Sequence, residues 1–168
     1  MQQFKIRDIV IDPPLILSPM AGVTDYTFRR LIKRRGGVGL VVSEFISVEG
    51  LTRHNPKAKR QMRFDPEERP FAVQIFGGQP DLPRLETILK EVKKAIAIPL
   101  TLKVRIGFSD STINAVEVAK MAEQCGVEHI QVHGRTKEQG YKGMANWDVI
   151  RAVKESVSVP VSGHGDIT

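Results

Sequence analysis

The chain has 168 residues and a formal net charge of +6, with 41% hydrophobic and 26% charged residues. This length and composition are typical of one soluble globular domain with a core, and no apolar run reaches the about 18 residues of a membrane-spanning helix. Lys5, Arg7 and Asp8 interrupt any secretory signal pattern, and a single cysteine excludes an internal disulfide. We therefore expect a cytoplasmic protein.

The first predicted unit is a strand, a tight turn and a helix. Residues 15–17 (Leu-Ile-Leu) read as a short buried strand, which the small-residue turn 18–22 (Ser-Pro-Met-Ala-Gly) ends. Thr24 or Asp25 can cap a helix over 26–35. The spacing predicts a βα unit whose loop lies at the ligand-binding edge of an α/β fold, although an ordinary βα loop has the same pattern.

Strands and helices alternate through the rest of the chain. The expected elements are a strand over 38–43, a polar and basic loop over 47–64 with one short helix, a strand over 70–76, a helix capped by Asp81 with apolar positions from 82 to 96, a strand over 98–104, a helix over 112–125, a strand over 129–133, a helix over 147–156 and a strand over 159–162. Equivalent points recur about 30 residues apart, as in a (β/α) barrel. We predict an α/β fold of the TIM-barrel type with parallel strands, incomplete at about six βα units, forming one domain over residues 1–168.

Charge is placed unevenly. Residues 1–63 contain 12 Lys and Arg against 5 Asp and Glu, whereas residues 64–168 contain 13 against 14. A basic face attracts a polyanion through phosphate neutralisation and counterion release. A solvated charged surface gives the same composition, so both interpretations stay open here.

Polar residues stand at or near the predicted ends of later strands. Gln74 lies within the third strand, Lys103 near the end of the fourth and His133 at the end of the fifth, while Gly163-His164-Gly165-Asp166 follows the sixth. In a parallel barrel such strand ends converge on one face. An amide, an ammonium, an imidazole and a glycine-rich turn together favour a planar, anionic, hydrogen-bonding cofactor. Taken singly, the lysine can pair with an acid, the histidine can be a core residue and the glycines can form a plain turn.

An ordered set of motifs now identifies a resemblance. The matching segments are Ser18-Pro19-Met20-Ala21-Gly22-Val23-Thr24-Asp25, Val73-Gln74-Ile75-Phe76-Gly77, Thr101-Leu102-Lys103-Val104-Arg105, Val132-His133-Gly134-Arg135-Thr136 and Val159-Pro160-Val161-Ser162-Gly163-His164-Gly165-Asp166-Ile167. Together they cover nearly the whole chain. The sequence resembles bacterial, FMN-dependent tRNA-dihydrouridine synthases.

The resemblance implies a barrel that binds FMN and reduces uridine to 5,6-dihydrouridine in tRNA, with NADPH as reductant and without a metal. The residues that it places at the flavin are Pro19, Met20, Ala21, Gln74, Lys103, His133, His164, Gly165 and Asp166, and those that it turns toward RNA are Arg135, Lys137 and Tyr141. It also implies that four distant side chains, Met20, Gln74, Lys103 and His133, meet around one flavin ring. The target base must leave its stack to reach that ring, so we expect the basic part of the chain to bind the body of the tRNA.

The chain departs from the family pattern in several places. The family's acid cysteine lies in an Asn-x-Gly-Cys-Pro motif that this sequence lacks, and Cys125 is not its equivalent because it lies on an apolar helical stripe. No catalytic residue is therefore assigned. About one βα unit is missing between Asp81 and Leu82, and the family's C-terminal helical RNA-binding domain is absent, so we expect an internally deleted and C-terminally truncated member. His164 replaces an asparagine of the family, and open barrel edges can pair with another chain.

Two other functions stay open at this stage. One is a different FMN-dependent barrel oxidoreductase of small pyrimidines, similar to dihydroorotate dehydrogenase. The other is a non-catalytic fragment that binds tRNA through its basic face. The sequence does not decide which uridines are modified or the oligomeric state.

Overall fold

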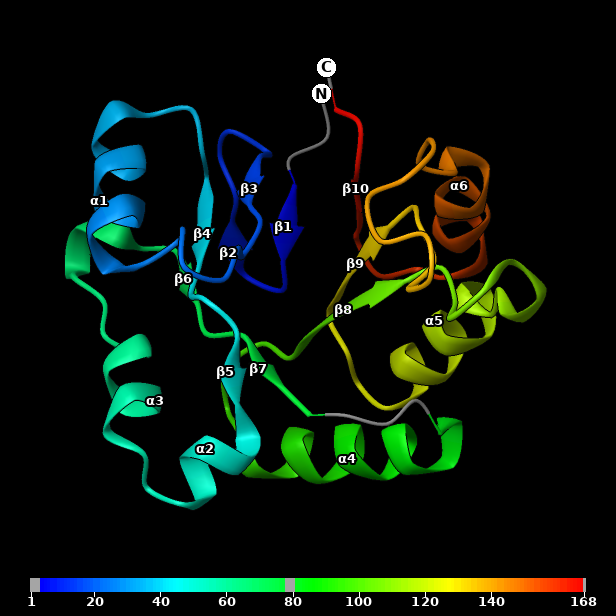
Figure 1. Cartoon of the computed structure of the whole chain (residues 1–168), viewed down its shortest axis with the longest axis horizontal. Helices are drawn as coiled ribbons and strands as arrows, with labels where there is room; N and C mark the ends of the chain where they lie inside the picture. The colour runs from blue at the N-terminus through cyan, green and yellow to red at the C-terminus, as the bar shows by residue number, and fades with distance from the viewer. Residues whose placement is uncertain (1–3, 78–80, 168) are drawn as a thin grey trace. The chain divides into compact units, whose positions relative to one another are not determined.

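A computed structural model describes residues 4–77 and 81–167 (Figure 1). The chain divides into two compact units, residues 1–79 and residues 80–168, which we call unit 1 and unit 2. Each is described by itself, so the expected single domain over residues 1–168 stays a prediction.

Unit 1 contains short strands and helices in βα order. Its elements are β1 (Lys5–Ile6), β2 (Ile9–Val10), β3 (Ile16–Leu17), α1 (Tyr26–Arg35), β4 (Leu40–Val42), β5 (Ile46–Ser47), α2 (Val48–Thr52), α3 (Pro56–Gln61), the 3-10 helix η1 (Pro66–Glu68), β6 (Phe71–Ala72) and β7 (Ile75–Phe76). Strands β3, β4 and β6 form a parallel sheet in that order, β5 pairs in parallel with β7, and β1 and β2 form an antiparallel hairpin. A small core beneath the first sheet contains Ile6, Ile11, Leu40 and Val42.

Helix α1 has the residues that the sequence predicts for its ends. The Asp25 carboxylate accepts from the Phe28 backbone N–H at 2.8 Å, which satisfies one of the free donors of the first turn. Gly36, with φ of +82°, ends the helix and donates its N–H to Ile32 and Lys33. The cap is therefore Asp25 and not Thr24.

Unit 2 contains three parallel strands covered by helices (Figure 1). Its elements are α4 (Leu82–Ala95), β8 (Thr101–Arg105), the 3-10 helix η2 (Asp110–Thr112), α5 (Ala115–Gln124), β9 (His129–His133), α6 (Trp147–Ser156) and β10 (Val161–His164). The strand order is β10-β9-β8. Apolar residues of alternate strand positions pack against the helices in one core, whose buried members include Ile130, Val132, Ala119, Ala122 and Val153.

Several boundaries differ from the sequence prediction. The strand expected over 70–76 is two short strands, because the chain leaves the sheet beside β4 at residues 73–74 and then pairs with β5. Helix α5 begins at Ala115, since Ser109 forms a capping box with a separate 3-10 turn before it. The stretch 47–64 contains two short helices instead of one. The side chain of Asp81 makes no cap hydrogen bond, so α4 starts without the expected cap.

The α/β class with parallel strands is confirmed. In the described ranges the sheets have three, three, two and two strands, and none closes into a barrel, as expected for an incomplete (β/α) barrel. Among the same residues, no helix combines the length and apolarity needed to cross a bilayer.

Candidate functional site

The sheet of unit 2 has one apolar face and one polar face. The valines and isoleucines of β8, β9 and β10 pack toward the helices, so the alternate residues point to the opposite side. The strand register aligns those alternate residues in two rows, which are Lys103, Gln131 and Ser162 in the first and Arg105, His133 and His164 in the second. We call these six residues the polar strand face.

The two histidines at the strand ends each have one buried ring nitrogen without a hydrogen-bond partner among the described residues. The ring centroids of His133 and His164 lie 4.6 Å apart and nearly perpendicular. Nε2 of His133 and Nδ1 of His164 are buried and have no hydrogen-bond partner among the described residues. Buried polar atoms are satisfied in the great majority of cases, so each unsatisfied one needs an explanation. A ligand with polar atoms on this face would supply it.

Burial and neighbouring cations keep both imidazoles neutral. Desolvation, with Arg105 next in importance, lowers the pKa of His133 to about 4, and the same kinds of cause lower the pKa of His164. Burial followed by the charge of Arg105 lowers the pKa of Lys103 to about 8. Within the described part of unit 2, Lys103 forms no ion pair. The face therefore combines an ammonium without a counter-ion and two neutral imidazoles, a set that suits an anionic ligand with hydrogen-bonding edges.

Gly163 and His164 lie within β10 and not after the last strand as predicted, so only Gly165 and Asp166 belong to the turn that follows it. Both glycines have a structural reason. A Cβ on Gly163 would fall on the indole of Trp147, and one on Gly165 would lie 3.0 Å from Ala145 Cβ and 3.2 Å from His133 Cδ2. Gly165 also has φ of +109°, where side chains are strained. The protein's own side chains occupy the space beside both glycines, so close packing explains them without a phosphate.

Asp166 and Arg135 contact each other at the end of this turn. The Arg135 guanidinium donates to Asp166 at 2.6 Å and to the Gly143 carbonyl at 2.8 Å, and Arg135 is only 6% exposed. The other Asp166 oxygen accepts the Ala145 N–H at 2.7 Å. Of the three residues expected to face RNA, Arg135 thus lies inside the protein, whereas Lys137 is exposed and Tyr141 is 82% exposed.

In unit 1 the predicted flavin residues also lie at strand ends. The turn after β3 holds Met20, whose backbone N–H donates to Thr24 Oγ1 at 2.9 Å, and Gly22, whose N–H donates to the Glu44 carboxylate at 2.7 Å. The Gln74 N–H donates to Ser43 Oγ at 2.9 Å. The turn and Gln74 are therefore both bound to the end of β4.

The residues that follow β4 are ones whose role the sequence did not indicate. Ser43 and Glu44 link the first turn and the third strand, yet nothing in their type or spacing marks them. Pro19 is buried in the same turn, and Met20 and Ala21 are exposed. Whether the residues of unit 1 meet those of unit 2 at one ring stays a prediction.

Part of the basic excess of unit 1 is neutralised internally. Arg29 forms a buried ion pair with Glu68 at 2.8 Å, and Arg30 and Arg34 both pair with Glu67. Arginines that are paired inside the fold do not attract a polyanion. The exposed cations of α3, which are Lys57, Lys59 and Arg60, form no ion pair within the described residues of unit 1.

Cys125 is placed where a thiol is inert. It is 6% exposed, and its Sγ lies 3.7 Å from Met121 Sδ and 3.8 Å from the Glu86 carbonyl oxygen. Burial raises the pKa of the thiol, which keeps it protonated at neutral pH.

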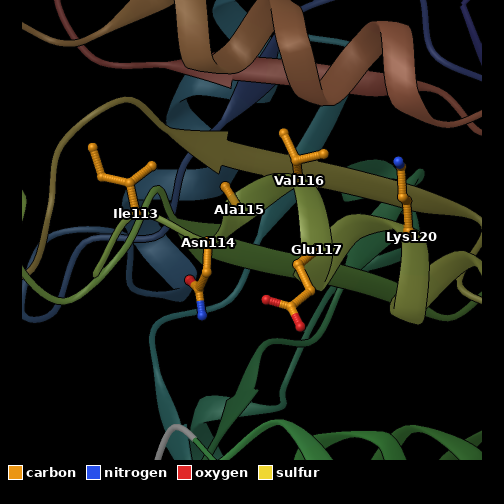
Figure 2. Close-up of a pocket in the computed structure, with 6 residues that line it drawn as sticks. All are labelled: Ile113, Asn114, Ala115, Val116, Glu117 and Lys120. Atoms are coloured by element: carbon orange, nitrogen blue, oxygen red, sulfur yellow. The ribbon is translucent and has the colours of Figure 1, made fainter. Parts of the chain in front are cut away.

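A shallow hollow lies away from the polar strand face, at the start of α5. Figure 2 shows its lining residues, which are Ile113, Asn114, Ala115, Val116, Glu117 and Lys120. None of the predicted site residues lines it, so it does not enter the site.

Known proteins are similar to this chain over almost its whole length. A family model described as dihydrouridine synthase (Dus) matches residues 16–83 and 81–168. The chain is 37% identical to a probable tRNA-dihydrouridine synthase of Rickettsia conorii, with 98% of this chain and 62% of that protein covered. It is 36% identical to tRNA-dihydrouridine synthase B of Vibrio parahaemolyticus and 34% identical to that of Pseudomonas aeruginosa, over 97% and 99% of this chain and 63% and 62% of those proteins.

The matches also locate the internal deletion. The alignment with the Rickettsia protein spans 207 positions whereas the chain has 168 residues, so at least 39 positions (207 minus 168) hold no residue of this chain. The two matched segments of the family model meet at residues 81–83, next to the predicted junction between Asp81 and Leu82 and to the boundary between the units. The chain spans less than two thirds of the length of these relatives. It belongs to the dihydrouridine synthase family.

Proposed function

We propose that this chain takes part in the flavin-dependent reduction of uridine to 5,6-dihydrouridine in tRNA, with FMN as cofactor and NADPH as reductant. The observation that supports it best is the pair of buried imidazole nitrogens, on His133 and His164, that have no partner on the polar strand face. The relatives carry the name tRNA-dihydrouridine synthase, and members of their family are generally flavin-dependent.

The polar strand face fits a flavin. The chemistry that FMN would supply when bound is hydride transfer from a nicotinamide to a pyrimidine ring. Lys103 offers a positive charge where a reduced ring is negative, and the two neutral imidazoles can each donate or accept at a ring edge. From unit 1 we assign Pro19, Met20, Ala21 and Gln74 to the same cofactor, and from the turn after β10 we assign Gly165 and Asp166.

The ammonium of Lys103 has a defined role in this assignment. Because burial lowers its pKa to about 8, a bound anion both compensates the buried charge and raises that pKa again. Affinity for the reduced flavin, whose ring is anionic, should therefore be retained below pH 8 and lost as the pH rises above it, since the neutral amine no longer attracts that ring.

RNA recognition is assigned to exposed residues. A uridine must be unstacked before it can reach a buried ring, and unstacked bases are commonly held on aromatic side chains. Tyr141 is exposed next to the cation Lys137, and α3 adds a basic surface in unit 1. Arg135 supports the Tyr141 loop from within, through Gly143 and Asp166.

Proton delivery is the step for which the chain lacks a group. Reduction adds a hydride to C6 and a proton to C5 of uracil, and in the family a cysteine gives that proton. The only cysteine here is buried with a raised pKa. The C5 proton must then come from water, and a missing general acid typically lowers the rate by about 10²–10⁴-fold.

We also propose that the protein acts in the cytoplasm, where tRNA is modified, and that the open strand edges allow self-association. In unit 2, β8 and β10 are the two edges of a three-stranded parallel sheet, and unpaired edges are templates for another chain. Sedimentation velocity at increasing protein concentration tests this; a single monomeric species up to about 100 μM contradicts it.

The function is tested by titrating the purified chain with FMN and then assaying unmodified tRNA with NADPH. We expect flavin fluorescence to be quenched on binding and dihydrouridine to form slowly in tRNA. A folded chain that leaves FMN fluorescence unchanged contradicts the proposal. Reduction of free pyrimidines in preference to tRNA would favour a dihydroorotate-dehydrogenase-like oxidoreductase, and salt-sensitive tRNA binding without flavin would favour a non-catalytic fragment.

A further inference from the structure

The segment after β9 is exposed at its tip but fixed at many points along its length. We call residues 135–145 the tyrosine loop. Its most exposed side chains are Tyr141 at 82% and Met144 at 77%. Exposed apolar side chains are common on protein surfaces, so what distinguishes this tip is the number of hydrogen bonds that hold the loop beneath it.

Two arginines hold the loop through hydrogen bonds, one from β8 and one from within the loop. Arg105 on β8 donates to the Thr136 and Gly140 carbonyls at 2.8 and 2.9 Å. Arg135, within the loop itself, donates to the Gly143 carbonyl. Backbone N–H groups of residues 137 and 138 donate to the carbonyls of residues 107 and 108, which adds a third support. The tip is therefore presented on a fixed base.

Asp166 joins both ends of this arrangement. One carboxylate oxygen accepts from Arg135 and the other accepts the Ala145 N–H, so a single side chain fixes the start and the end of the loop. The Ala145 N–H and the Arg135 guanidinium hold the pKa of Asp166 below its usual range. Both Asp166 oxygens thus have a partner within the protein.

We infer that Asp166, together with Arg105, is a positioning residue that holds the tyrosine loop so that Tyr141 can stack on an unpaired base of RNA. The inference rests on the proposed function for its partner. It gives Asp166 a role that acts through Arg135 and Ala145. A fixed aromatic ring binds an unstacked base without first having to be ordered, which is the advantage of such a support.

The chemistry of the tip favours RNA with open bases over a duplex. Tyr141 offers an exposed ring, over which the Arg105 guanidinium carbon lies at 5.9 Å, and the same loop contains the exposed residues Lys137 and Lys142, whose charges can attract phosphates. A duplex offers phosphates but no free base. The loop should therefore contribute to binding of a single strand and little to binding of a duplex.

The main test is Asp166→Asn in the full chain. Asparagine replaces one acceptor with an N–H that opposes either Arg135 or the Ala145 N–H, so the loop loses an anchor at almost constant volume. We expect trypsin to cut after Lys137 and Lys142 about tenfold faster, as followed by mass spectrometry, and affinity for a 12-nucleotide oligouridylate to fall about tenfold while affinity for a duplex of that length is unchanged. Arg105→Lys should act in the same direction, because both carbonyls accept from Arg105 Nη1 and the shorter lysine side chain ends one atom before that position.

The matched control is Asp148→Asn, the same exchange on an exposed helix of the same unit, where the side chain is 89% exposed. It should leave cleavage and both affinities unchanged. Circular dichroism of each variant verifies the fold, and the conservative exchange at position 166 keeps the test informative if Arg105→Lys does not fold.

A double-mutant cycle separates positioning from general damage. If Asp166 acts through Tyr141, then Asp166→Asn should cost oligouridylate affinity in the unaltered protein but almost none in a Tyr141→Ala background. Equal losses in both backgrounds, or unchanged trypsin cleavage in Asp166→Asn, overturn the inference. If the unaltered protein binds neither oligouridylate nor tRNA, the proposed function and the RNA part of the inference both fail, while the cleavage rates still decide the positioning role.

Discussion

Units 1 and 2 both contain buried positive side chains, but the two units treat them differently. In unit 1 the Arg29 guanidinium is 1% exposed and is bonded to Glu68 at 2.8 Å, to the Thr24 carbonyl at 3.0 Å and to the Arg63 carbonyl at 2.8 Å. In unit 2 Lys103 is half-buried without an acid beside it among the described residues. The comparison teaches that the number of charges alone does not locate a candidate site, because the arginine is satisfied inside the fold.

The physical reason is desolvation. A buried charge costs free energy unless it is paired and hydrogen-bonded, so a folded protein either satisfies it or uses it. Arg29 is satisfied within unit 1 and serves the fold. Nε2 of His133 and Nδ1 of His164 are not satisfied within the described part of unit 2, and Lys103 is half-buried there without an acid, so these groups would gain from a polar partner.

The largest effect should follow from breaking the satisfied pair of unit 1. Arg29→Met leaves the buried Glu68 carboxylate without its counter-ion, which should lower the free energy of unfolding by about 3–5 kcal/mol in urea titrations followed by circular dichroism. Arg34→Met removes a pair whose arginine is 62% exposed and should cost at most about 1 kcal/mol. Equal losses of unfolding free energy in the two variants would contradict the expected difference between the buried and the exposed ion pair.

The next effect has opposite signs for stability and for binding. Lys103→Met removes the buried ammonium, so the flavin-free protein should become about 1–3 kcal/mol more stable at pH 7, while FMN affinity should fall at least about tenfold. The stability gain should shrink between pH 8 and 10.5, where the native lysine is already neutral and the unfolded one is not. Lys120→Met, on the exposed surface of α5, is the control for both measurements. A loss of stability in Lys103→Met contradicts the assignment of an unpaired charge.

The smallest effect concerns acid. Burial lowers the pKa of both His129 and His133 to about 4, against 6.5 when unfolded. Since the unfolded chain binds more protons between these values, their stabilisation is complete above pH 6.5 and is lost as the pH falls toward 4, by about 1–2 kcal/mol for each. Urea unfolding of unit 2, followed by the fluorescence of Trp147, the only tryptophan, measures it at pH 7, 5.5 and 4.5. In His129→Gln the free energy of unfolding should depend less on pH than in the unaltered protein. An equal dependence in both would count against the buried histidines as its cause.

The placement of polar residues near strand ends could be predicted from motifs. Lys103 and His133 lie on β8 and β9 as expected, and the register sets Arg105 and His164 beside His133. What could not be predicted is which polar groups pair with one another. Arg135 was expected to face RNA, yet it donates to Asp166, a residue expected at the flavin.

The ion-pair partners of the α1 arginines could not be predicted from the sequence either. Spacing alone places Arg29, Arg30 and Arg34 on a helix, and it gives no sign that Glu67 and Glu68 reach them from a later turn. Such partners are more than thirty residues apart in sequence, and only the packing of η1 against α1 brings them together.

The sequence by itself determined the alternation of the main strands and helices, the family and the expected place of the internal deletion. Hydrophobic periodicity and capping are local properties, and motifs are read directly from residue types. Only the tertiary structure decided which charged and polar groups are satisfied within each unit and which are not. That outcome depends on distances between side chains that are remote along the chain, and on the burial that makes an unpaired nitrogen costly.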